Sequence, residues 1–457
     1  MNQFQRVHFV GIGGYGMSAI ARVMLDLGYI VSGSDVSRQD ATTRLELLGA
    51  TVYIGHDRNH VSGVDCVVYS TAVTSDNEEL IAAREAGIPV YHRSQLLAKL
   101  MDERKGIAIA GAHGKTTTTS MISFILQDAG LDPTYVIGGV LTNVGDNARA
   151  GTGEYLVAEA DESDGSFIHY RPQYAVVTNI EADHLENYDG NFEKLKGAYR
   201  KFFSNVNSAG KIIACWDDPI VRELLADDPH PILKYGLQQG EDATAKEIEL
   251  FDRGARFEMV RAGVPIGVLE LSIPGIHNVC NAMAAALAAL EAGVEFAKIA
   301  SALKKFTGAK RRFQVHYESP VLTVVDDYAH HPTEIRATLA AAKASGRRIV
   351  AVFQPQRYTR TYYLFEEFSR AFQAADEVVL TDIYSPAGEK PIDGVSSEKL
   401  ALLISENSGV HTVYLPTKED VVSYLLENMQ DGDLILTMGA GDIYKVAERV
   451  AGARVVQ

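Results

Sequence analysis

Short runs of apolar, often β-branched residues alternate with segments of helical periodicity along almost the whole chain, and this alternation constrains the fold more than any other feature. Val7–Val10 predicts a buried strand, and the apolar positions between residues 17 and 24 then follow helical spacing. Strands that alternate with helices form βαβ units, in which helices cover a mostly parallel sheet. We therefore predict an α/β protein.

The same alternation of strands and helices begins again twice, each time after a short run of basic residues. Arg104–Lys105 precedes a predicted strand at Gly106–Ala110, and Lys310–Arg312 precedes another at Val321–Val325. The length of 457 residues suits three domains of about 150 residues each. We expect three consecutive domains, at residues 1–103, 104–311 and 312–457. Further predicted elements are strands at Tyr29–Ser32, Val64–Tyr69, Tyr155–Glu159, Tyr174–Ile180, Ile349–Phe353, Glu377–Thr381 and Leu434–Thr437, antiparallel hairpins within Lys246–Ile273, and helices at His277–Glu291 and Pro332–Ala344.

Composition excludes several classes of protein. Hydrophobic residues make up 46% and charged residues 22%, which is ordinary globular usage. The 43 basic and 59 acidic residues give a net charge of −16, so we expect no nucleic-acid partner. Cys66, Cys215 and Cys280 are too widely spaced for a zinc site or a disulfide framework. Because Met1–Val10 lacks a signal-peptide core and Ala282–Leu290 is too short to span a membrane, we expect a cytoplasmic protein without a membrane partner.

A glycine-rich turn follows the first predicted strand. Gly11, Gly13 and Gly16 satisfy the G-x-G-x-x-G pattern, and Asp35 ends the second strand. Glycines let the backbone approach a ligand closely, and the helix N-terminus favours an anionic diphosphate. A tight strand–helix turn is the alternative interpretation. The pattern predicts a nucleotide-diphosphate site without naming the nucleotide; in a dehydrogenase, Asp35 would bind a ribose hydroxyl.

A second glycine-containing loop, residues 111–116 (GAHGKT), lies between a predicted strand and a helix. Its backbone amides can bind phosphates, Lys115 can neutralise the β- and γ-phosphates, and the Thr116 hydroxyl can ligate Mg²⁺. The loop departs from the strict P-loop pattern because Ile109 occupies the first glycine position. A polar turn with a solvated lysine is the alternative, but the flanking strand and helix favour ATP binding.

Acidic residues gather at the carboxyl end of the next strand of this domain. Glu159, Asp161, Glu162 and Asp164 offer the oxygen ligands that Mg²⁺ prefers, although a solvated acidic turn is the usual reading of such a run. Their position downstream of a P-loop favours a metal site. His184, which ends the segment 179–184 (NIEADH), is a candidate second metal ligand or base.

Two strand ends of the third domain carry polar clusters. Asp326–Glu334 contains two aspartates and two histidines, and Gln354–Arg360 contains two arginines suited to bind carboxylate or phosphate. Ligands of open α/β sheets lie outside the carboxyl ends of the strands. Part of the first cluster has a capping explanation, because Pro332 suits a first helical turn and Glu334 favours a helix start.

Taken in order, these motifs and His277–Asn281 resemble those of the Mur ligases, the ATP-dependent amide-forming ligases of bacterial peptidoglycan synthesis, over essentially the whole chain. The resemblance implies a Rossmann-like N-terminal domain that binds a UDP-sugar, a central P-loop domain that binds ATP, and a Rossmann-like C-terminal domain that binds the amino acid. It also implies two Mg²⁺ ions, and a monomer or weak homodimer.

By resemblance and position, each site receives candidate residues. The UDP-sugar site is assigned Gly11, Gly13, Gly14, Gly16, Asp35, Ser70 and Thr71; the ATP site Gly111, Ala112, His113, Gly114, Lys115, Thr116, Thr117, Asn278 and Asn281; the metal site Thr116, Glu159 and His184; the muramoyl and amino-acid site Tyr328, His330, Arg357 and Arg360; and catalysis Lys115, His184, Arg312 and Asp327. The chain departs from the family pattern at Gln356, where a histidine is expected.

Within the family, the resemblance implies the branch that joins L-alanine to the lactyl carboxylate of UDP-N-acetylmuramate. An acyl phosphate would form, and ADP and phosphate would be released. The branch that attaches a recycled tripeptide is the near alternative. More remote alternatives are a P-loop ATPase switch, which leaves the first and third domains without substrates, and an NAD-dependent oxidoreductase, which leaves the P-loop and the third-domain clusters unexplained.

Overall fold

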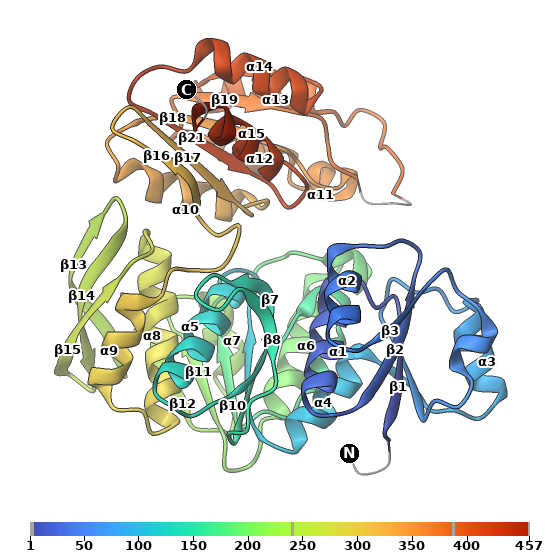
Figure 1. Ribbon diagram of the computed structural model, residues 1–457. Helices are drawn as coiled ribbons and strands as arrows, with labels where there is room; N and C mark the ends of the chain where they lie inside the picture. Colours follow the sequence, from blue (N-terminus) through green and yellow to red (C-terminus); the bar gives the residue numbers. More distant parts are fainter. Residues whose placement is uncertain (1–3, 239–241, 386–388, 456–457) are drawn as a thin grey trace. The chain divides into compact units, whose positions relative to one another are not determined.

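Three β-sheets, each accompanied by helices, follow one another along the chain (Figure 1). The computed structural model describes residues 4–238, 242–385 and 389–455; Met1–Gln3 of the N-terminal segment considered above lie outside it. Contacts group the chain into two compact units: residues 1–246, 258–269 and 280–306 form the first, and residues 247–257, 270–279 and 307–457 form the second. Each unit is described by itself.

The first sheet is wholly parallel, with the strand order β3-β2-β1-β4-β5. Its two faces bury different apolar residues: Val7 and Phe9 of β1 pack with α1 and α4, and Val10 packs on the other face with Leu80 of α3. The elements are β1 (Arg6–Val10), α1 (Tyr15–Asp26), β2 (Ile30–Asp35), α2 (Asp40–Leu47), β3 (Thr51–Ile54), η1 (Arg58–Val61), β4 (Cys66–Tyr69), α3 (Glu78–Glu85), β5 (Val90–His92) and α4 (Arg93–Asp102).

The second sheet has ten strands in the order β15-β14-β13-β12-β11-β10-β6-β9-β7-β8. Its central strands are parallel, and β7 and β8 form an antiparallel pair at one edge. The elements are β6 (Lys105–Ala110), α5 (Lys115–Asp128), β7 (Thr134–Leu141), β8 (Asp146–Arg149), β9 (Tyr155–Glu159), η2 (Glu162–Asp164), η3 (Ser166–His169), β10 (Tyr174–Val177), η4 (Leu185–Tyr188), α6 (Phe192–Ser204), β11 (Lys211–Cys215), α7 (Pro219–Leu225), β12 (Ile232–Tyr235), β13 (Ala243–Phe251), β14 (Gly254–Arg261), β15 (Val264–Leu271), α8 (Ile276–Glu291) and α9 (Phe296–Lys305).

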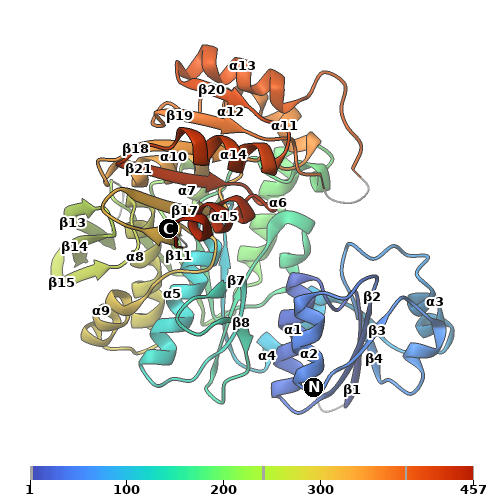
Figure 2. The ribbon, with the colours of Figure 1, turned by 45° about the horizontal axis from the view of Figure 1, so that its top comes forward.

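The third sheet has the order β16-β17-β21-β18-β19-β20 and is parallel except for β16. Residues of α10, α12 and α13 cover one face, and residues of α14 and α15 cover the other (Figure 2). The elements are β16 (Gln314–Glu318), β17 (Leu322–Asp327), α10 (Pro332–Lys343), β18 (Arg348–Phe353), α11 (Tyr358–Tyr363), α12 (Phe365–Ser369), β19 (Glu377–Leu380), α13 (Ser397–Ser408), β20 (His411–Tyr414), α14 (Lys418–Asn428), β21 (Asp433–Met438) and α15 (Tyr444–Val455).

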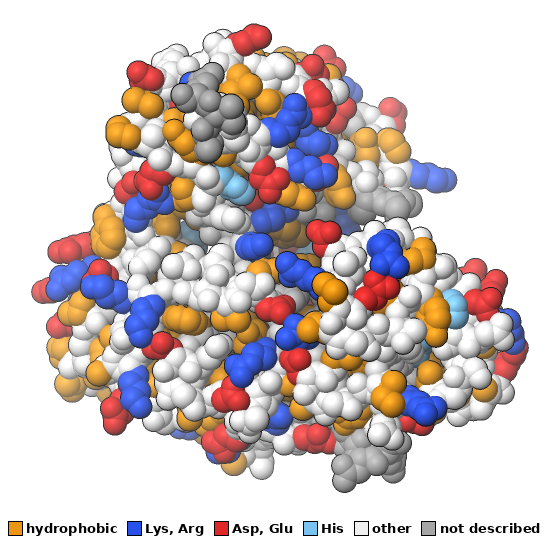
Figure 3. Space-filling model, in the orientation of Figure 1, with side chains coloured by type: hydrophobic (Ala, Val, Ile, Leu, Met, Phe, Trp, Pro, Cys, Tyr) orange, Lys and Arg blue, Asp and Glu red, His pale blue; other side chains and the backbone are white. Residues whose placement is uncertain are grey.

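The predicted α/β fold with mostly parallel sheets is confirmed. Each predicted strand is present, with ends shifted by up to three residues, and two-residue turns at 252–253 and 262–263 join the predicted hairpin strands. The edge strands β8 and β16 were not predicted, because edge strands lack the continuous apolar run that marks a strand buried on both faces. Among the described residues, every helix is too short or too polar to cross a membrane. On the face drawn in Figure 3, basic and acidic side chains are interspersed.

A buried carboxylate lies at the centre of a polar cluster beneath the first sheet. Glu79, which is fully buried, accepts hydrogen bonds from Ser34 Oγ (2.5 Å) and lies 2.6 Å from His60 Nδ1 and 3.2 Å from His56 Nδ1. Burial alone raises the pKa of Glu79, but the His8 ring, 3.6 Å away, and hydrogen bonds with Ser34 and His60 together lower it to about 2. The ionised carboxylate therefore stabilises the fold.

We expect Glu79→Ala to lower the free energy of unfolding by about 3 kcal/mol at pH 7, because it removes the buried anion around which these polar side chains gather. Since the folded pKa is depressed, this contribution is complete above the ordinary value of 4.5 and disappears as the pH falls towards about 2. Urea unfolding as a function of pH measures it. Glu85→Gln, on the same helix and exposed, should change stability by less than about 1 kcal/mol; equal losses in both variants would contradict the prediction.

Candidate functional site

The glycine loop after β1 is held by the end of β2. The backbone N–H groups of Gly11 and Ile12 donate to Ser34 O at 2.8 and 3.0 Å, and Gly13 N donates to Asp35 Oδ2 at 2.8 Å. A Cβ at Gly13 would lie only 2.8 Å from that oxygen, so a side chain cannot be accommodated there without movement. Asp35 is 5% exposed and lies beneath the loop, where it binds loop backbone. This hydrogen bond helps to hold the conformation of the loop.

The second loop, between β6 and α5, is folded against the end of β10. Ala112 N donates to Asn179 O (3.1 Å), His113 N donates to Asn179 Oδ1 (2.8 Å), and Thr178 Oγ1 donates to His113 O (2.6 Å). Gly111 and Gly114 have positive φ values of 136° and 84°, which favour glycine. The loop ends at the N-terminus of α5, where the amides of Lys115, Thr116 and Thr117 begin the helix. This is the arrangement that binds phosphate groups.

Lys115 turns back over its own loop. Its Nζ donates to Gly111 O at 2.5 Å, to Ala112 O at 3.2 Å, and to both carboxylate oxygens of Glu162 at 2.8 Å. Although burial lowers the pKa of Lys115, the Glu162 and Asp161 carboxylates raise it above its ordinary value. The lysine is therefore a protonated ammonium group held against the backbone of the loop.

Glu159 lies next to the first turn of α5. Its Oε2 accepts a hydrogen bond from Thr116 Oγ1 (3.3 Å), and its Oε1 accepts one from Gly138 N of β7 (2.6 Å). Burial raises the pKa of Glu159, against the opposing effects of Gly138 and Lys115. A Cβ at Gly138 would approach this carboxylate to 2.6 Å. A hydroxyl and a carboxylate side by side beneath a phosphate-binding loop fit a Mg²⁺ ion.

The acidic turn after β9 connects the loop of α5 with the first sheet. Glu162, 2% exposed, holds Lys115, and Asp164 Oδ2 accepts hydrogen bonds from Thr71 Oγ1 and Arg93 Nη2, both at 2.9 Å. Thr71 lies after β4, directly after Ser70, and both were predicted to belong to the UDP-sugar site. Arg93 was not predicted: a single arginine at the start of a helix has no motif that distinguishes it from a surface residue.

His184 and His113 each lie beside acidic residues. His184, which has a φ of 54°, lies 3.6 Å from Asp183 Oδ2 and 3.7 Å from Glu186 Oε1. Burial raises the pKa of Asp161, but Lys115, the hydrogen bond with Ser163, Arg93 and, last, His184 together lower it below its ordinary value. His113 Nε2 lies 3.2 Å from Glu181 Oε2. The structure therefore brings His184 into the electrostatic environment of the acidic turn.

Helix α8 supplies the two predicted asparagines. Asn281 contacts the phosphate-binding loop: a Cβ at Gly114 would lie 2.6 Å from Asn281 Oδ1. Asn278 is one turn earlier on α8, and its Nδ2 donates to Pro274 O at 2.7 Å. Both asparagines are buried.

In the second unit, the end of β17 carries a buried acid. Asp327 accepts hydrogen bonds from Phe313 N (2.8 Å) and Ala329 N (2.7 Å). Burial raises its pKa to about 6, although the nearby Arg312 guanidinium acts in the opposite direction. Arg312 lies over the ring of Tyr328 at 5.2 Å, and its Nη1 is 4.0 Å from Glu334 Oε1. The structure places the predicted Arg312, Asp327 and Tyr328 in one cluster.

Asp327 was predicted to be catalytic, and a carboxylate can accept a proton only in its anionic form, so we expect kcat/KM to fall about tenfold per pH unit below about 6. Above that pH the carboxylate is ionised and activity should be independent of this group. In Asp327→Asn, the activity that remains should no longer show this fall at acidic pH. Steady-state rates between pH 5 and 8 measure the profile, and an unchanged acidic limb in the variant would assign it to another residue.

The remaining predicted residues of the second unit lie at the ends of β17 and β18. His330 Nδ1 is 2.9 Å from Tyr328 O and 3.3 Å from Glu334 Oε2. Glu334 forms a capping box with His331 at the start of α10, which Pro332 begins, so the predicted capping role is confirmed.

Gln356 occupies the position where the family pattern expects histidine. Its Oε1 accepts a hydrogen bond from Arg360 Nη1 at 2.8 Å, so this glutamine orients the buried Arg360. Arg357 directly precedes α11 and has a φ of 68°, and its N–H donates to Tyr384 O at 2.9 Å.

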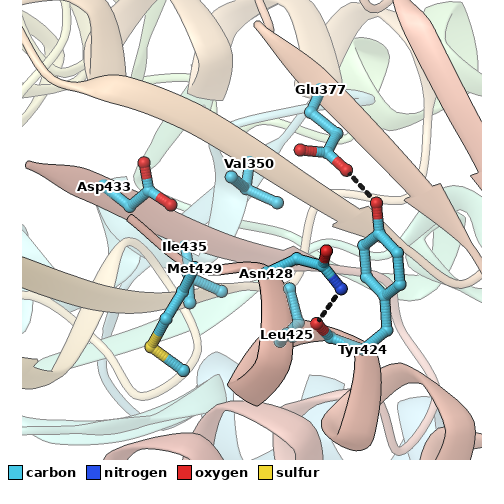
Figure 4. A pocket seen from close by; sticks show the side chains of 8 residues that line it. All are labelled: Val350, Glu377, Tyr424, Leu425, Asn428, Met429, Asp433 and Ile435. Carbon is cyan, nitrogen blue, oxygen red and sulfur yellow. Dashed lines mark hydrogen bonds between the residues drawn. The ribbon is translucent and has the colours of Figure 1, made fainter. Parts of the chain in front are cut away.

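A small cavity lies at the opposite edge of the third sheet, at the amino ends of the strands (Figure 4). Glu377 and Asp433 line it, and both form ion pairs with Arg348. Its volume of about 10 Å³ leaves room for a single water molecule. We therefore assign this cavity no substrate.

The three sheets match three family models. Residues 6–105 match the Mur ligase family catalytic domain, residues 109–289 the Mur ligase middle domain, and residues 311–441 the Mur ligase glutamate ligase domain.

The similarity to known proteins extends over nearly the whole chain. The UDP-N-acetylmuramate–L-alanine ligase of Pelotomaculum thermopropionicum is 52% identical over 446 residues, 97% of this chain and 96% of that protein. The corresponding ligase of Symbiobacterium thermophilum is 48% identical, over 99% and 95%. Among solved structures, UDP-N-acetylmuramate–alanine ligase from Thermotoga maritima superposes with a TM-score of 0.82 (28% identity, 99% of both chains), and a murein peptide ligase from Psychrobacter arcticus with 0.71 (27% identity, 98% of both chains). The predicted family is thus confirmed, and the chain belongs to the Mur ligases.

Proposed function

We propose that this protein is the ATP-dependent ligase that joins L-alanine to the lactyl carboxylate of UDP-N-acetylmuramate in the cytoplasm, giving ADP and phosphate. ATP dependence is supported by one observation: the Lys115 ammonium is held against a phosphate-binding loop, beside Glu159 and Thr116. The choice of L-alanine rests on the names of relatives 47–52% identical over nearly the full chain.

In the first step, a lactyl carboxylate oxygen attacks the γ-phosphorus of ATP and ADP leaves, which gives an acyl phosphate. Negative charge is spread over the oxygens of the transferring group, where the Lys115 ammonium and the amides at the start of α5 stabilise it. Glu159 and Thr116 would hold Mg²⁺, with His184 at a second ion. The metal would neutralise phosphate charge when bound.

In the second step, the amine of L-alanine attacks the acyl carbon, and phosphate leaves as the tetrahedral intermediate collapses. The amine must be unprotonated; α-amino groups of peptides titrate near about 8, and the pKa of the amine of a free amino acid is higher. His184, His330 and Asp327 are the candidate bases. We assign Tyr328, His330, Arg357 and Arg360 to the muramoyl group and the amino acid, since arginines bind carboxylates well.

We also propose domain boundaries at residues 103/104 and 311/312. The first domain would bind UDP through Gly11, Gly13, Gly14 and Gly16, with Ser70 and Thr71 nearby. The second would bind ATP through residues 111–117, Asn278 and Asn281. The third would contribute Arg312 and Asp327.

Phosphate release by the purified protein tests this function. Mg²⁺ and ATP are supplied with UDP-N-acetylmuramate alone, then with L-alanine, and then with the L-alanyl-γ-D-glutamyl-diaminopimelate tripeptide. Release that requires both UDP-N-acetylmuramate and L-alanine supports the proposal. Release only with the tripeptide would assign the protein to the recycling branch, and release with ATP alone would indicate an ATPase.

A further inference from the structure

A single guanidinium lies between the glycine loop of the first sheet and the acidic turn of the second. Arg93 is the first residue of α4, and its Nη1 lies 3.4 Å from the position that a Cβ of Gly16 would occupy. Its Nη2 donates to Asp164 Oδ2 at 2.9 Å and lies 3.9 Å from Asp161 Oδ2. One end of this cation thus faces the loop that would bind a diphosphate, and the other binds the acidic turn.

Asp164 is held on several sides. Thr71 Oγ1 donates to the same Oδ2 at 2.9 Å, and Ser166 N donates to Oδ1 at 3.0 Å. Burial raises the pKa of Asp164, but the Arg93 charge and these hydrogen bonds lower it below its ordinary value. The carboxylate is therefore an anion whose position depends on Arg93 and Thr71.

The same short turn also holds the lysine of the phosphate-binding loop. Glu162 and Asp164 are the first and last residues of η2, and Glu162 binds the Lys115 ammonium through both oxygens. Tyr188 Oη donates to Glu162 O at 2.6 Å and fixes the backbone of the turn. Because η2 has only three residues, a displacement of Asp164 moves the anchor of Lys115.

We propose that Arg93 is a positioning residue that couples the UDP-sugar site to the ATP site through Asp164 and Glu162; this rests on the proposed binding of UDP at the glycine loop. A diphosphate at Gly16 fixes the guanidinium, which fixes Asp164 and the turn that holds Lys115. The second nucleotide then meets an ordered site and loses less entropy on binding. Coupling of this kind acts equally in both directions.

Calorimetric titration of Mg·ADP, with and without saturating UDP-N-acetylmuramate, measures the coupling. In the wild-type protein, the UDP-sugar should tighten Mg·ADP binding by about fivefold or more. In Arg93→Gln and Asp164→Asn the factor should fall to about one. The double variant should match the single variants, because each removes the same link. Arg93→Lys keeps the positive charge, but a lysine ammonium cannot face the glycine loop and bind Asp164 with two separate nitrogens. This variant should therefore keep only part of the coupling.

Arg22→Gln is the matched control. Arg22 of α1 forms an ion pair with Asp146 of β8 at 3.2 Å, which also joins the first sheet to the second but touches neither loop. This variant should retain the wild-type coupling factor. If Arg93→Gln keeps full coupling, or if Arg22→Gln loses as much, the proposal is wrong. Circular dichroism confirms that each variant is folded, and Arg93→Lys preserves the test if Arg93→Gln is not.

Failure of the proposed function gives a different result. If the wild-type protein binds UDP but not UDP-N-acetylmuramate, the substrate assignment is wrong, and UDP serves as the probe of the glycine loop for the same measurement. If the wild-type protein binds neither, both proposals are overturned. If both bind without changing Mg·ADP affinity, only the coupling is overturned.

Discussion

Replacement of Lys115 with alanine should reduce ADP formation by at least about 10³-fold. The ammonium is placed where charge develops on the transferring phosphoryl group, and loss of one such fixed charge typically costs about 10²–10³ or more in rate. Near wild-type ADP formation by this variant would show that the loop between β6 and α5 is not the catalytic nucleotide site.

The Lys115 variant also leaves Glu162 without its cation. A buried carboxylate that loses its partner destabilises a protein by about 3–5 kcal/mol, so a loss of activity alone could reflect unfolding. The double variant Lys115→Ala/Glu162→Gln removes that uncompensated charge. We expect it to recover thermal stability while turnover remains as low as in the single variant, which separates the chemical role from the structural one.

Glu159→Gln should reduce kcat/KM by about 10²-fold or more at millimolar Mg²⁺, because a metal that neutralises phosphate charge contributes several kcal/mol. Glutamine retains the size of the side chain and an oxygen that can accept from Gly138 N, so the fold should persist. Activity measured over a range of Mg²⁺ concentrations should require much more metal in the variant.

Glu154→Gln is the control for that substitution. Glu154 directly precedes β9, the strand that Glu159 ends, and its exposed side chain forms an ion pair with Lys105 at 2.9 Å. We expect wild-type activity and an unchanged Mg²⁺ requirement. An unaltered Mg²⁺ dependence in Glu159→Gln itself would exclude this carboxylate as a ligand.

Local sequence patterns predicted the sheets and the loops that bear the candidate site. Apolar runs marked the buried strands, and glycines with a following lysine or acid marked the two loops, because these signals depend on a few adjacent residues. Glu159, Asp327 and Arg360 were singled out in the same way, as polar residues at strand ends. Their proposed roles in binding and catalysis stay predictions.

Contacts between distant segments were beyond prediction. Asp35 Oδ2 accepts a hydrogen bond from Gly13 N, a contact that the local sequence pattern did not predict, and the assignment of Asp35 to the UDP-sugar site stays a prediction. Arg93 and Asp164 are separated by 71 residues, and the Glu79 cluster joins four separate segments. Such pairs depend on how the helices pack on the sheets, which periodicity leaves open.

The closed ring of contacts around Lys115 has a consequence for ligand selection. Glu162 already neutralises the ammonium, so an arriving anion must outcompete a carboxylate that is covalently tethered nearby. A lone orthophosphate or sulfate ion offers few contacts with which to replace Glu162. A triphosphate offers more, because it can engage the loop amides along its length as well as the lysine. We therefore expect orthophosphate and sulfate to compete only weakly with ATP for this loop.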